Sequence, residues 1–314
     1  MSGADGANGG APVGVPTGMT GYLAAEGYLD ELLEEVGPAA EVHGRLALVP
    51  GPARRAAWAA NIWHEPLRIA APSVGKAAQA LRALQRNWAL YSSGHHRRAA
   101  LIQEKLPKVS AKKLVFPAPA PAAPLGSWTL IDATMLLAAQ RCSSPFPNGE
   151  AAFVEDKSGP PNRAYLKLWE ALTLLGRHPG PGESCLDLGA SPGGWTWALQ
   201  RLGAHVLAVD KAPLAPAVAA LPNVRFMKAS AFALAPADIE PVDWLVSDVV
   251  CYPDRLLGLV ETWLASGRAR NMVCTVKFQG ATDMAAVRRF AALPGARLLH
   301  LHHNKHELTW LWPA

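Results

Sequence analysis

The sequence of 314 residues has little cysteine and no long apolar run. Its four cysteines, Cys142, Cys185, Cys251 and Cys274, show no C-x-x-C spacing, and three of them lie in apolar strand or strand-end contexts. Such usage gives no sign of a disulfide framework and is typical of reduced, buried thiols in a cytoplasmic protein. No apolar stretch approaches ~18 residues, so no membrane span is expected.

The N-terminus lacks the pattern of a secretory signal peptide. Residues 1–21 are rich in Gly, Ala and Pro, but they contain neither a basic segment nor a continuous apolar segment. A segment of this composition buries too little apolar surface to fold on its own, so we expect residues 1–20 to form a disordered tail.

Positive charge is unevenly distributed, although the net charge is only +5. Between residues 51 and 113 there are 12 Lys or Arg against Glu65 and Glu104, a local excess of +10. This excess indicates a polyanionic partner. The alternative is an ordinary solvated face, because Lys and Arg are mostly exposed in any protein.

The length of the chain predicts two domains, and half of its residues are hydrophobic, which is ample for a core. Pro and Ala alternate over residues 117–124, where they favour an extended, semi-rigid spacer. We therefore expect an N-terminal domain at 21–116, a linker and strand-bearing connector at 117–160, and a second domain at 161–314.

The N-terminal domain is predicted to be a small α+β unit. Residues 21–50 are acidic and amphipathic, and Tyr28, Leu29, Leu32, Leu33 and Val36 recur at helical spacing. Residues 73–87 carry Ala and Leu at helical spacing with basic residues between them, and Trp88–Tyr91 follows as an expected strand.

A glycine-rich turn in the second domain is the most informative motif. Residues 185–194 read Cys-Leu-Asp-Leu-Gly-Ala-Ser-Pro-Gly-Gly, a buried-strand pattern that leads into the helical run Trp195–Leu202. Gly189, Gly193 and Gly194 let the backbone approach a ligand closely, and the following helix N-terminus presents N–H groups to a carboxylate or phosphate.

The next strand of this domain ends in an acidic residue. The apolar run His205–Val209 leads to Asp210, which lies 21 residues after Gly189, about where a ribose-binding acid lies in a dinucleotide fold. Ser191-Pro192 stands at the centre of the turn, which departs from G-x-G-x-x-G and disfavours pyrophosphate. The pattern favours an adenosine-type cofactor; a tight turn in an α/β sheet is the alternative.

Asp-Leu-Gly-Ala-Ser-Pro-Gly-Gly-Trp at 187–195 resembles the S-adenosylmethionine loop of the FtsJ-type ribose 2′-O-methyltransferases. The resemblance implies an α/β fold, a Rossmann-like class I methyltransferase sheet with an antiparallel last strand, and S-adenosyl-L-methionine as cofactor. It implies contacts to that cofactor from Asp187, Gly189, Ser191, Pro192, Gly193, Gly194, Trp195, Asp210, Ser230 and Asp248.

The same family surrounds the ribose hydroxyl with a Lys-Asp-Lys-Glu tetrad, and the resemblance supplies a candidate for each member. Lys167 lies in a helical stretch that begins near Asn162, and Asp248 and Lys277 each end an apolar strand. Glu307 opens the last strand instead of closing it. Because that strand runs antiparallel in methyltransferase sheets, its start falls on the edge where the parallel strands end.

The resemblance also implies roles for these four residues. Lys277 contacts the hydroxyl, because an amine beside another cation gives up its proton more readily and can then accept one. Asp248 holds Lys277, Glu307 orients Lys167 or the ribose, and Lys167 offsets negative charge developing on oxygen. Which group takes the proton stays open.

Further motifs resemble the RlmM branch of this family, whose members methylate a cytidine ribose in large-subunit ribosomal RNA and carry an RNA-binding THUMP region. They are Cys142–Gly149 and Asp248–Arg255 with the helical run that follows. The branch implies an RNA partner, namely ribosomal RNA, and a THUMP-like N-terminal domain. Ser230 departs from the acid that usually holds the adenine amino group.

Several residues keep two interpretations. Trp58, Trp63, Trp88 and Tyr91 could stack on RNA bases, whereas aromatics in a small α+β domain more often form its core. The spacing of His302, His303 and His306 is not that of H-E-x-x-H, so no metal site is predicted. Competing functions are a small-molecule methyltransferase and an RNA-binding protein that has lost activity.

Overall fold

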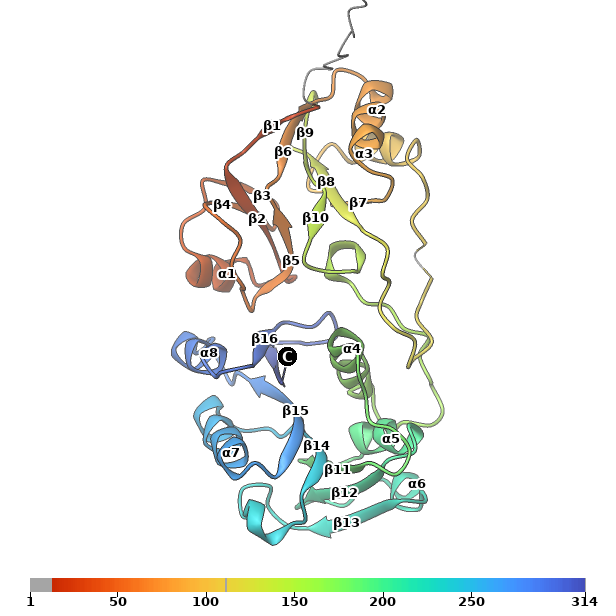
Figure 1. Cartoon of the computed structure of the whole chain (residues 1–314), viewed down its shortest axis with the longest axis vertical. Helices are drawn as coiled ribbons and strands as arrows, with labels where there is room; N and C mark the ends of the chain where they lie inside the picture. Colours follow the sequence, from red (N-terminus) through yellow and green to blue (C-terminus); the bar gives the residue numbers. More distant parts are fainter. Residues whose placement is uncertain (1–12, 111, 314) are drawn as a thin grey trace, which may run out of the picture.

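The computed structural model describes residues 13–110 and 112–313. Figure 1 shows an N-terminal region of strands and short helices above a second region built on one large sheet. No helix among the described residues is both long enough and apolar enough to span a bilayer. All four cysteines are free thiols, and Cys185, Cys251 and Cys274 are buried.

The N-terminal region contains two five-stranded sheets, with strand orders β1-β6-β9-β8-β7 and β10-β5-β2-β4-β3. Its elements are β1 (Val15–Pro16), β2 (Met19–Ala24), α1 (Leu29–Val36), β3 (Glu41–His43), β4 (Leu46–Pro50), β5 (Ala59–His64), β6 (Leu67–Ala70), α2 (Val74–Leu84), β7 (Trp88–Leu90), α3 (His96–Gln103), β8 (Gly126–Leu130), β9 (Met135–Ala139) and β10 (Arg141–Cys142).

Two predicted boundaries of this region are wrong. The expected tail at 1–20 already contains β1 and the start of β2, whereas residues 1–12 lie outside the described residues. The expected connector at 117–160 supplies β8, β9 and β10, which complete the two N-terminal sheets. Long-range strand pairing causes both errors, since β1 pairs with β6 and β8 pairs with β7 across the spacer.

Inside the region, the helical predictions are confirmed in part. The apolar spacing from Tyr28 to Val36 gives α1, and residues 73–87 give α2, whose N-cap Ser73 accepts a hydrogen bond from the amide of Lys76. The rest of 21–50 forms β2, β3 and β4. Residues 88–90 form the predicted strand β7.

The second region is a seven-stranded sheet of order β13-β12-β11-β14-β15-β17-β16. Its elements are α4 (Tyr165–Leu175), β11 (Ser184–Leu188), α5 (Gly194–Arg201), β12 (His205–Asp210), α6 (Pro216–Ala219), β13 (Val224–Lys228), β14 (Val242–Ser247), α7 (Pro253–Ser266), β15 (Ala269–Lys277), α8 (Met284–Ala291), β16 (Arg297–Leu299) and β17 (Glu307–Trp312). Strands β11 to β15 are parallel and β17 is antiparallel to β15, as predicted.

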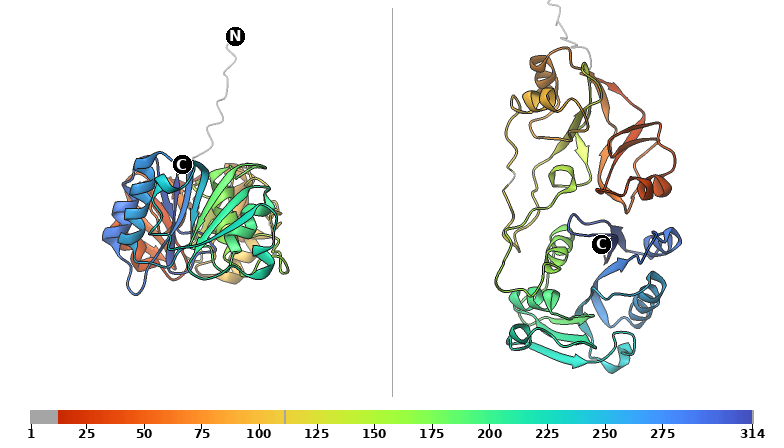
Figure 2. Two further views of the ribbon diagram at one scale, coloured as in Figure 1. Left: turned by 90° about the horizontal axis from the view of Figure 1, so that it is seen from below. Right: turned by 180° about the vertical axis from the view of Figure 1, so that it is seen from behind.

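Helices cover both faces of this sheet, and the alternation of side chains along β11 shows how. Leu186 and Leu188 pack in one apolar cluster with α7 and α8, whereas Cys185 packs in another with α4, α5 and α6. Figure 2 shows the sheet between the two helical layers. This is the three-layer α/β arrangement of Rossmann-like domains.

The two regions share one hydrophobic core. The ring centroid of Tyr28 lies 4.7 Å from that of Trp58, 5.1 Å from that of His300 and 5.6 Å from that of His306. Trp58 in turn lies 5.8 Å from Phe278. Aromatic contacts of this kind bury large apolar areas, so the N-terminal region is packed firmly against the start of β17.

Candidate active site

The carboxyl edge of the large sheet gathers the four predicted charged residues. Asp248 directly follows β14, Lys277 ends β15, and Glu307 opens β17. Lys277 and Glu307 are register partners, because β17 runs antiparallel to β15. Lys167 reaches the same place from α4.

All four side chains belong to one chain of contacts. Lys167 Nζ lies 2.7 Å and 2.9 Å from the two carboxylate oxygens of Asp248 and 3.0 Å from Glu307 Oε1. Lys277 Nζ lies 3.0 Å from Asp248 Oδ1. The sequence-predicted tetrad is therefore assembled as one cluster of two cations and two anions.

Burial holds the side chains of this cluster in fixed positions. The side chain of Lys167 is 9% exposed and that of Glu307 is 10% exposed, whereas Lys277 keeps 19%. Lys167 is held by two carboxylates and Lys277 by one, so Lys277 retains N–H positions for a ligand. Among the tetrad members it is the lysine best placed to touch a hydroxyl.

A cavity of about 710 Å³ opens onto the tetrad. Lys167, Lys277 and Glu307 line it, together with further basic side chains at Lys113, Arg163 and Lys305 and with His302 and His303. Lys113 comes from the segment between α3 and β8, and the others come from the second region or the approach to it. A negatively charged chain fits this lining.

The glycine turn lies beside the tetrad, between β11 and α5. Gly189 has φ +81°, and a Cβ there would lie 2.7 Å from the Cα of Val249, the residue after Asp248. Gly193 has φ +115°, and its Cβ would meet the side chain of Val218 at 2.8 Å. Glycine at both positions is thus required by the fold itself.

Asp210 braces this turn. Its Oδ2 accepts a hydrogen bond from the amide of Ser191 at 3.0 Å, and its Oδ1 accepts one from the amide of Ala212 at 2.9 Å. The half-buried carboxylate stays at the carboxyl end of β12, where a ribose-binding acid is expected. Ser230, just beyond β13, is half-buried, and its Oγ accepts a hydrogen bond from the amide of Phe232 at 3.3 Å.

Two predicted cofactor contacts occupy other places. Asp187 is 1% exposed beneath the turn, where its Oδ2 accepts a 2.6 Å hydrogen bond from Thr196, and burial raises the pKa of its carboxyl to about 7. Trp195 is 3% exposed, and its Nε1 donates to the carbonyl of Ala164. Both side chains support the turn from inside, because strand β11 and helix α5 turn them into the core.

Glu170 is a site residue that sequence reasoning missed. Its carboxylate, 2% exposed, accepts hydrogen bonds from the amides of His302 and His303 and lies 2.7 Å from Nδ1 of His303. It thereby fixes the loop that leads into Glu307. The signal that could have found it is its spacing from Lys167, which places both residues on one face of α4.

Burial decides between the two interpretations of the aromatic residues. Trp58, Trp63 and Trp88 are fully buried and Tyr91 is 8% exposed, so these aromatics belong to the core and not to a base-stacking surface. Among the described residues, no group of three His, Cys, Asp or Glu side chains is arranged to hold a metal ion. Tyr252, four residues after Asp248 in the sequence, is 66% exposed and directly precedes α7.

Comparison with known proteins agrees with this geometry. The model of the family described as "FtsJ-like methyltransferase" matches residues 160–264, the stretch from the approach to α4 through most of α7. Residues 160–264 are thus similar to the FtsJ-like methyltransferases. The glycine turn, Lys167 and Asp248 all lie within the matched stretch.

Curated relatives match a longer part of the chain. It is 40% identical over 157 residues to "Ribosomal RNA large subunit methyltransferase M" of Halorhodospira halophila, covering 48% of this chain and 46% of the relative. The protein of the same name from Aromatoleum aromaticum is 38% identical over 164 residues, covering 47% and 44%. The chain thus spans about half the length of the curated relatives it matches.

The residues of the second region fit S-adenosylmethionine, the methyl donor that the similarity to the FtsJ-like methyltransferases implies. Gly189 and Gly193 have positive φ angles and no Cβ, so the backbone of the turn stays open, and the first amides of α5 have no partner inside the helix. Asp210 would hold the ribose hydroxyls, and the exposed end of the turn would receive the methionine part.

Proposed function

We propose that this chain transfers a methyl group from S-adenosylmethionine to a ribose 2′-hydroxyl of RNA, and that ribosomal RNA is its substrate. The observation that carries the proposal is the contact of Lys167, Asp248, Lys277 and Glu307 beside the glycine turn. The names of the curated relatives support ribosomal RNA. An enzyme with this substrate would act in the cytoplasm.

The reaction requires the protein to align the ribose hydroxyl with the methyl group and to remove one proton. S-adenosylmethionine, when bound, supplies a methyl group already activated by its sulfonium. Lys277 would contact the ribose hydroxyl with a position on its amine that Asp248 leaves free, would hold the oxygen in line with the methyl group and, in its neutral form, would accept the hydroxyl proton. Lys167, held by two carboxylates, would keep positive charge beside the oxygen as the proton leaves.

RNA would approach through the cavity at the tetrad. Lys113 and Lys305 line that cavity and would contact phosphates on either side of the target nucleotide, whereas Arg163 is paired there with Glu155. Tyr252, exposed beside Asp248, offers an aromatic face for a base. The N-terminal region would add the exposed members of its basic segment, and we assign it an RNA-binding, THUMP-like role on this basis.

Ribosomal RNA and radiolabelled S-adenosylmethionine test the proposal. The parent chain should label the RNA, and an Asp248→Asn/Lys277→Ala variant that still binds the cofactor should not. The labelled nucleotide should resist alkaline cleavage at its 3′ phosphate, since a methylated 2′-oxygen cannot attack it. Label on a base, in a strand that alkali still cleaves at that nucleotide, would contradict the ribose assignment.

A catalytically inactive RNA-binding protein is the less favoured alternative. Ser230 replaces the usual adenine-binding acid, but the tetrad is complete and in contact. Absence of methyl transfer to any RNA, together with normal RNA binding, would restore that alternative.

A further inference from the structure

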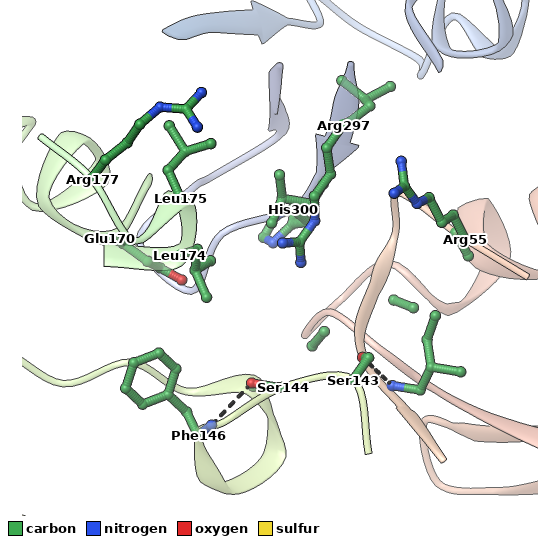
Figure 3. Close-up of a pocket in the computed structure, with 17 residues that line it drawn as sticks. Arg55, Ser143, Ser144, Phe146, Glu170, Leu174, Leu175, Arg177, Arg297 and His300 are labelled. Carbon is green, nitrogen blue, oxygen red and sulfur yellow. Dashed lines mark hydrogen bonds between the residues drawn. The ribbon is translucent and has the colours of Figure 1, made fainter. Parts of the chain in front are cut away.

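A second cavity lies at the junction of the two regions, apart from the tetrad. It has a volume of about 380 Å³ and is bordered by the second half of α4, by β16 and by the segment before β5. Figure 3 shows Arg297 and His300 together on its wall, with Arg55 on one side and Arg177 on the other.

The arginines of this cavity have no acidic partner within residues 13–110 and 112–313. Arg55 donates to the carbonyl of Ala296 at 3.2 Å, which brings it next to Arg297. Among the described residues, no carboxylate lies within ion-pair distance of Arg55, Arg177 or Arg297. Arg297 is half-buried and Arg55 is exposed. A half-buried arginine without a counter-ion is costly to the folded protein, so Arg297, with the exposed Arg55 beside it, indicates a ligand of opposite charge.

The other charged groups of the wall do not compensate for them. Glu170 borders the cavity, but its carboxylate is already occupied by the amides of His302 and His303 and by the ring of His303. His300 has a depressed pKa, about 4, mainly because of burial, and is neutral near pH 7. Burial and the charge of Arg55 likewise lower the pKa of Arg297.

We infer that this cavity binds a phosphate group, held by the guanidinium groups of Arg55 and Arg297. Guanidinium groups match phosphate oxygens in a forked geometry that a lysine cannot offer. The two arginines come from different regions, so the site exists only where the N-terminal region meets β16. Ser143 and Ser144 border the same cavity. Their amides and the Ser143 hydroxyl donate within the protein, whereas the Ser144 hydroxyl accepts from the amide of Phe146 and keeps its hydrogen for a ligand.

Helix α4 relates the phosphate site to the tetrad. Lys167 contacts the tetrad, Glu170 borders both the histidine loop and the cavity, and Leu174 lies farther inside the cavity. At 1.5 Å per residue, Lys167 and Leu174 are about 10 Å apart along the helix. If the proposed function holds, a backbone phosphate near the target nucleotide would occupy the site; otherwise the same chemistry would take a free phosphate.

Chemical protection tests the inference directly. The full chain is treated with an arginine-specific dicarbonyl reagent, alone, with a short single-stranded ribo-oligonucleotide, or with inorganic phosphate, and Arg55 and Arg297 are followed by mass spectrometry. Protection by the oligonucleotide alone identifies RNA as the source of the phosphate, and protection by inorganic phosphate at lower concentration identifies a free anion. Equal modification under all three conditions overturns the inference.

Binding over a salt series gives the second measurement. Arg55→Gln and Arg297→Gln are each expected to weaken oligonucleotide binding about tenfold, the loss of one hydrogen bond to a charged group. Each should reduce the slope of log K against log salt by about 0.7 for one single-strand phosphate. Arg288→Gln, on the exposed face of α8 and away from both cavities, is the matched control.

The outcomes separate this inference from the proposed function. Arg55 is exposed, so its replacement should leave the melting temperature unchanged even if Arg297→Gln fails to fold. Methyl transfer is measured on the same preparations. Protection of the arginines without methyl transfer by the parent chain contradicts the proposed function and leaves the phosphate site standing. Methyl transfer with unprotected arginines and unchanged salt slopes supports the proposed function and contradicts the phosphate site.

Discussion

Two groups of basic side chains lie near α4, and they differ in whether carboxylates pair with them. At the tetrad, each lysine lies within 3.0 Å of a carboxylate. At the junction cavity, Arg55 and Arg297 have no such partner among the described residues. Cations that are paired with carboxylates are held in fixed positions, where they can orient a substrate. Cations without such a partner can pair with a ligand of opposite charge. Stability, activity and binding should therefore respond differently at the two places.

Lys167→Met should give the largest effect, because it removes the cation from the buried Glu307 and one of two cations from Asp248. Breaking a buried ion pair costs about 3–5 kcal/mol, so the free energy of unfolding should fall by about that amount. Denaturant titration measures it. A Lys167→Met/Asp248→Asn/Glu307→Gln variant should regain most of the stability and remain inactive. Arg55→Gln, at the junction, should leave stability unchanged; equal losses at both places would break the comparison.

Lys277→Ala should abolish most of the activity with little effect on folding. A loss of kcat of about 10²-fold or more is expected for removing a general base or the group that orients the hydroxyl. Calorimetry should find nearly normal affinity for S-adenosylmethionine. Lys277→Arg keeps the charge and cannot release its proton, so it distinguishes the two roles. A fully active Arg variant would exclude proton removal by Lys277.

Glu170→Gln sharpens the comparison, because Glu170 lies between the two groups of cations. A loss of about 1–3 kcal/mol of unfolding free energy is expected, because the histidine loop keeps its amides but loses a charged acceptor. Because Glu170 is a positioning residue for Glu307, the substitution should also lower kcat more than it changes KM. A stability loss with unaltered kcat would reduce its role to folding alone.

His300 makes the junction sensitive to acid. Its pKa is depressed from 6.5 to about 4, with burial as the main cause. A depressed pKa contributes stability that is present above pH 6.5 and is lost as the pH falls toward 4. The melting temperature of the parent chain should therefore fall more steeply over this range than that of His300→Gln. Parallel curves would show that His300 protonates freely in the folded chain.

The exposed basic residues of the N-terminal half should give the smallest effect per residue. Replacing Arg97, Lys112 and Lys113 together by Gln should flatten the salt dependence of RNA binding by up to about 0.7 for each phosphate that is no longer neutralised. Arg98 is kept, because its guanidinium donates to the carbonyl of Ala71. An unchanged slope would exclude Lys113 as a phosphate contact of the tetrad cavity and leave Lys305 and the junction arginines as the RNA surface.

The sequence predicted the tetrad well because strand ends are local features. An apolar run that stops at Asp248 or Lys277 places that residue at the sheet edge whatever else the chain does. The start of β17 at Glu307 followed from the antiparallel last strand of the family. The sheet and the glycine turn were predictable for the same reason.

Contacts between distant segments were not predictable. The basic segment 51–113 suggested a uniform RNA surface, yet Arg68 pairs with Glu41 and Arg54 donates to the carbonyl of Val36. The roles of Asp187 and Trp195 depended on which way the chain turned their side chains. Arg55 and Arg297 are 242 residues apart, and only the packing of two regions brings them together.

The shared aromatic core limits how far the two regions can move relative to each other during the reaction. Tyr28 and Trp58 are packed with His300, His306 and Phe278, and Glu31 accepts a hydrogen bond from Thr282 across the same boundary. Two regions joined in this way do not separate to admit a substrate. If RNA is the substrate, as proposed, the conformational change falls to the RNA, whose target nucleotide has to leave its own base stack to reach the tetrad.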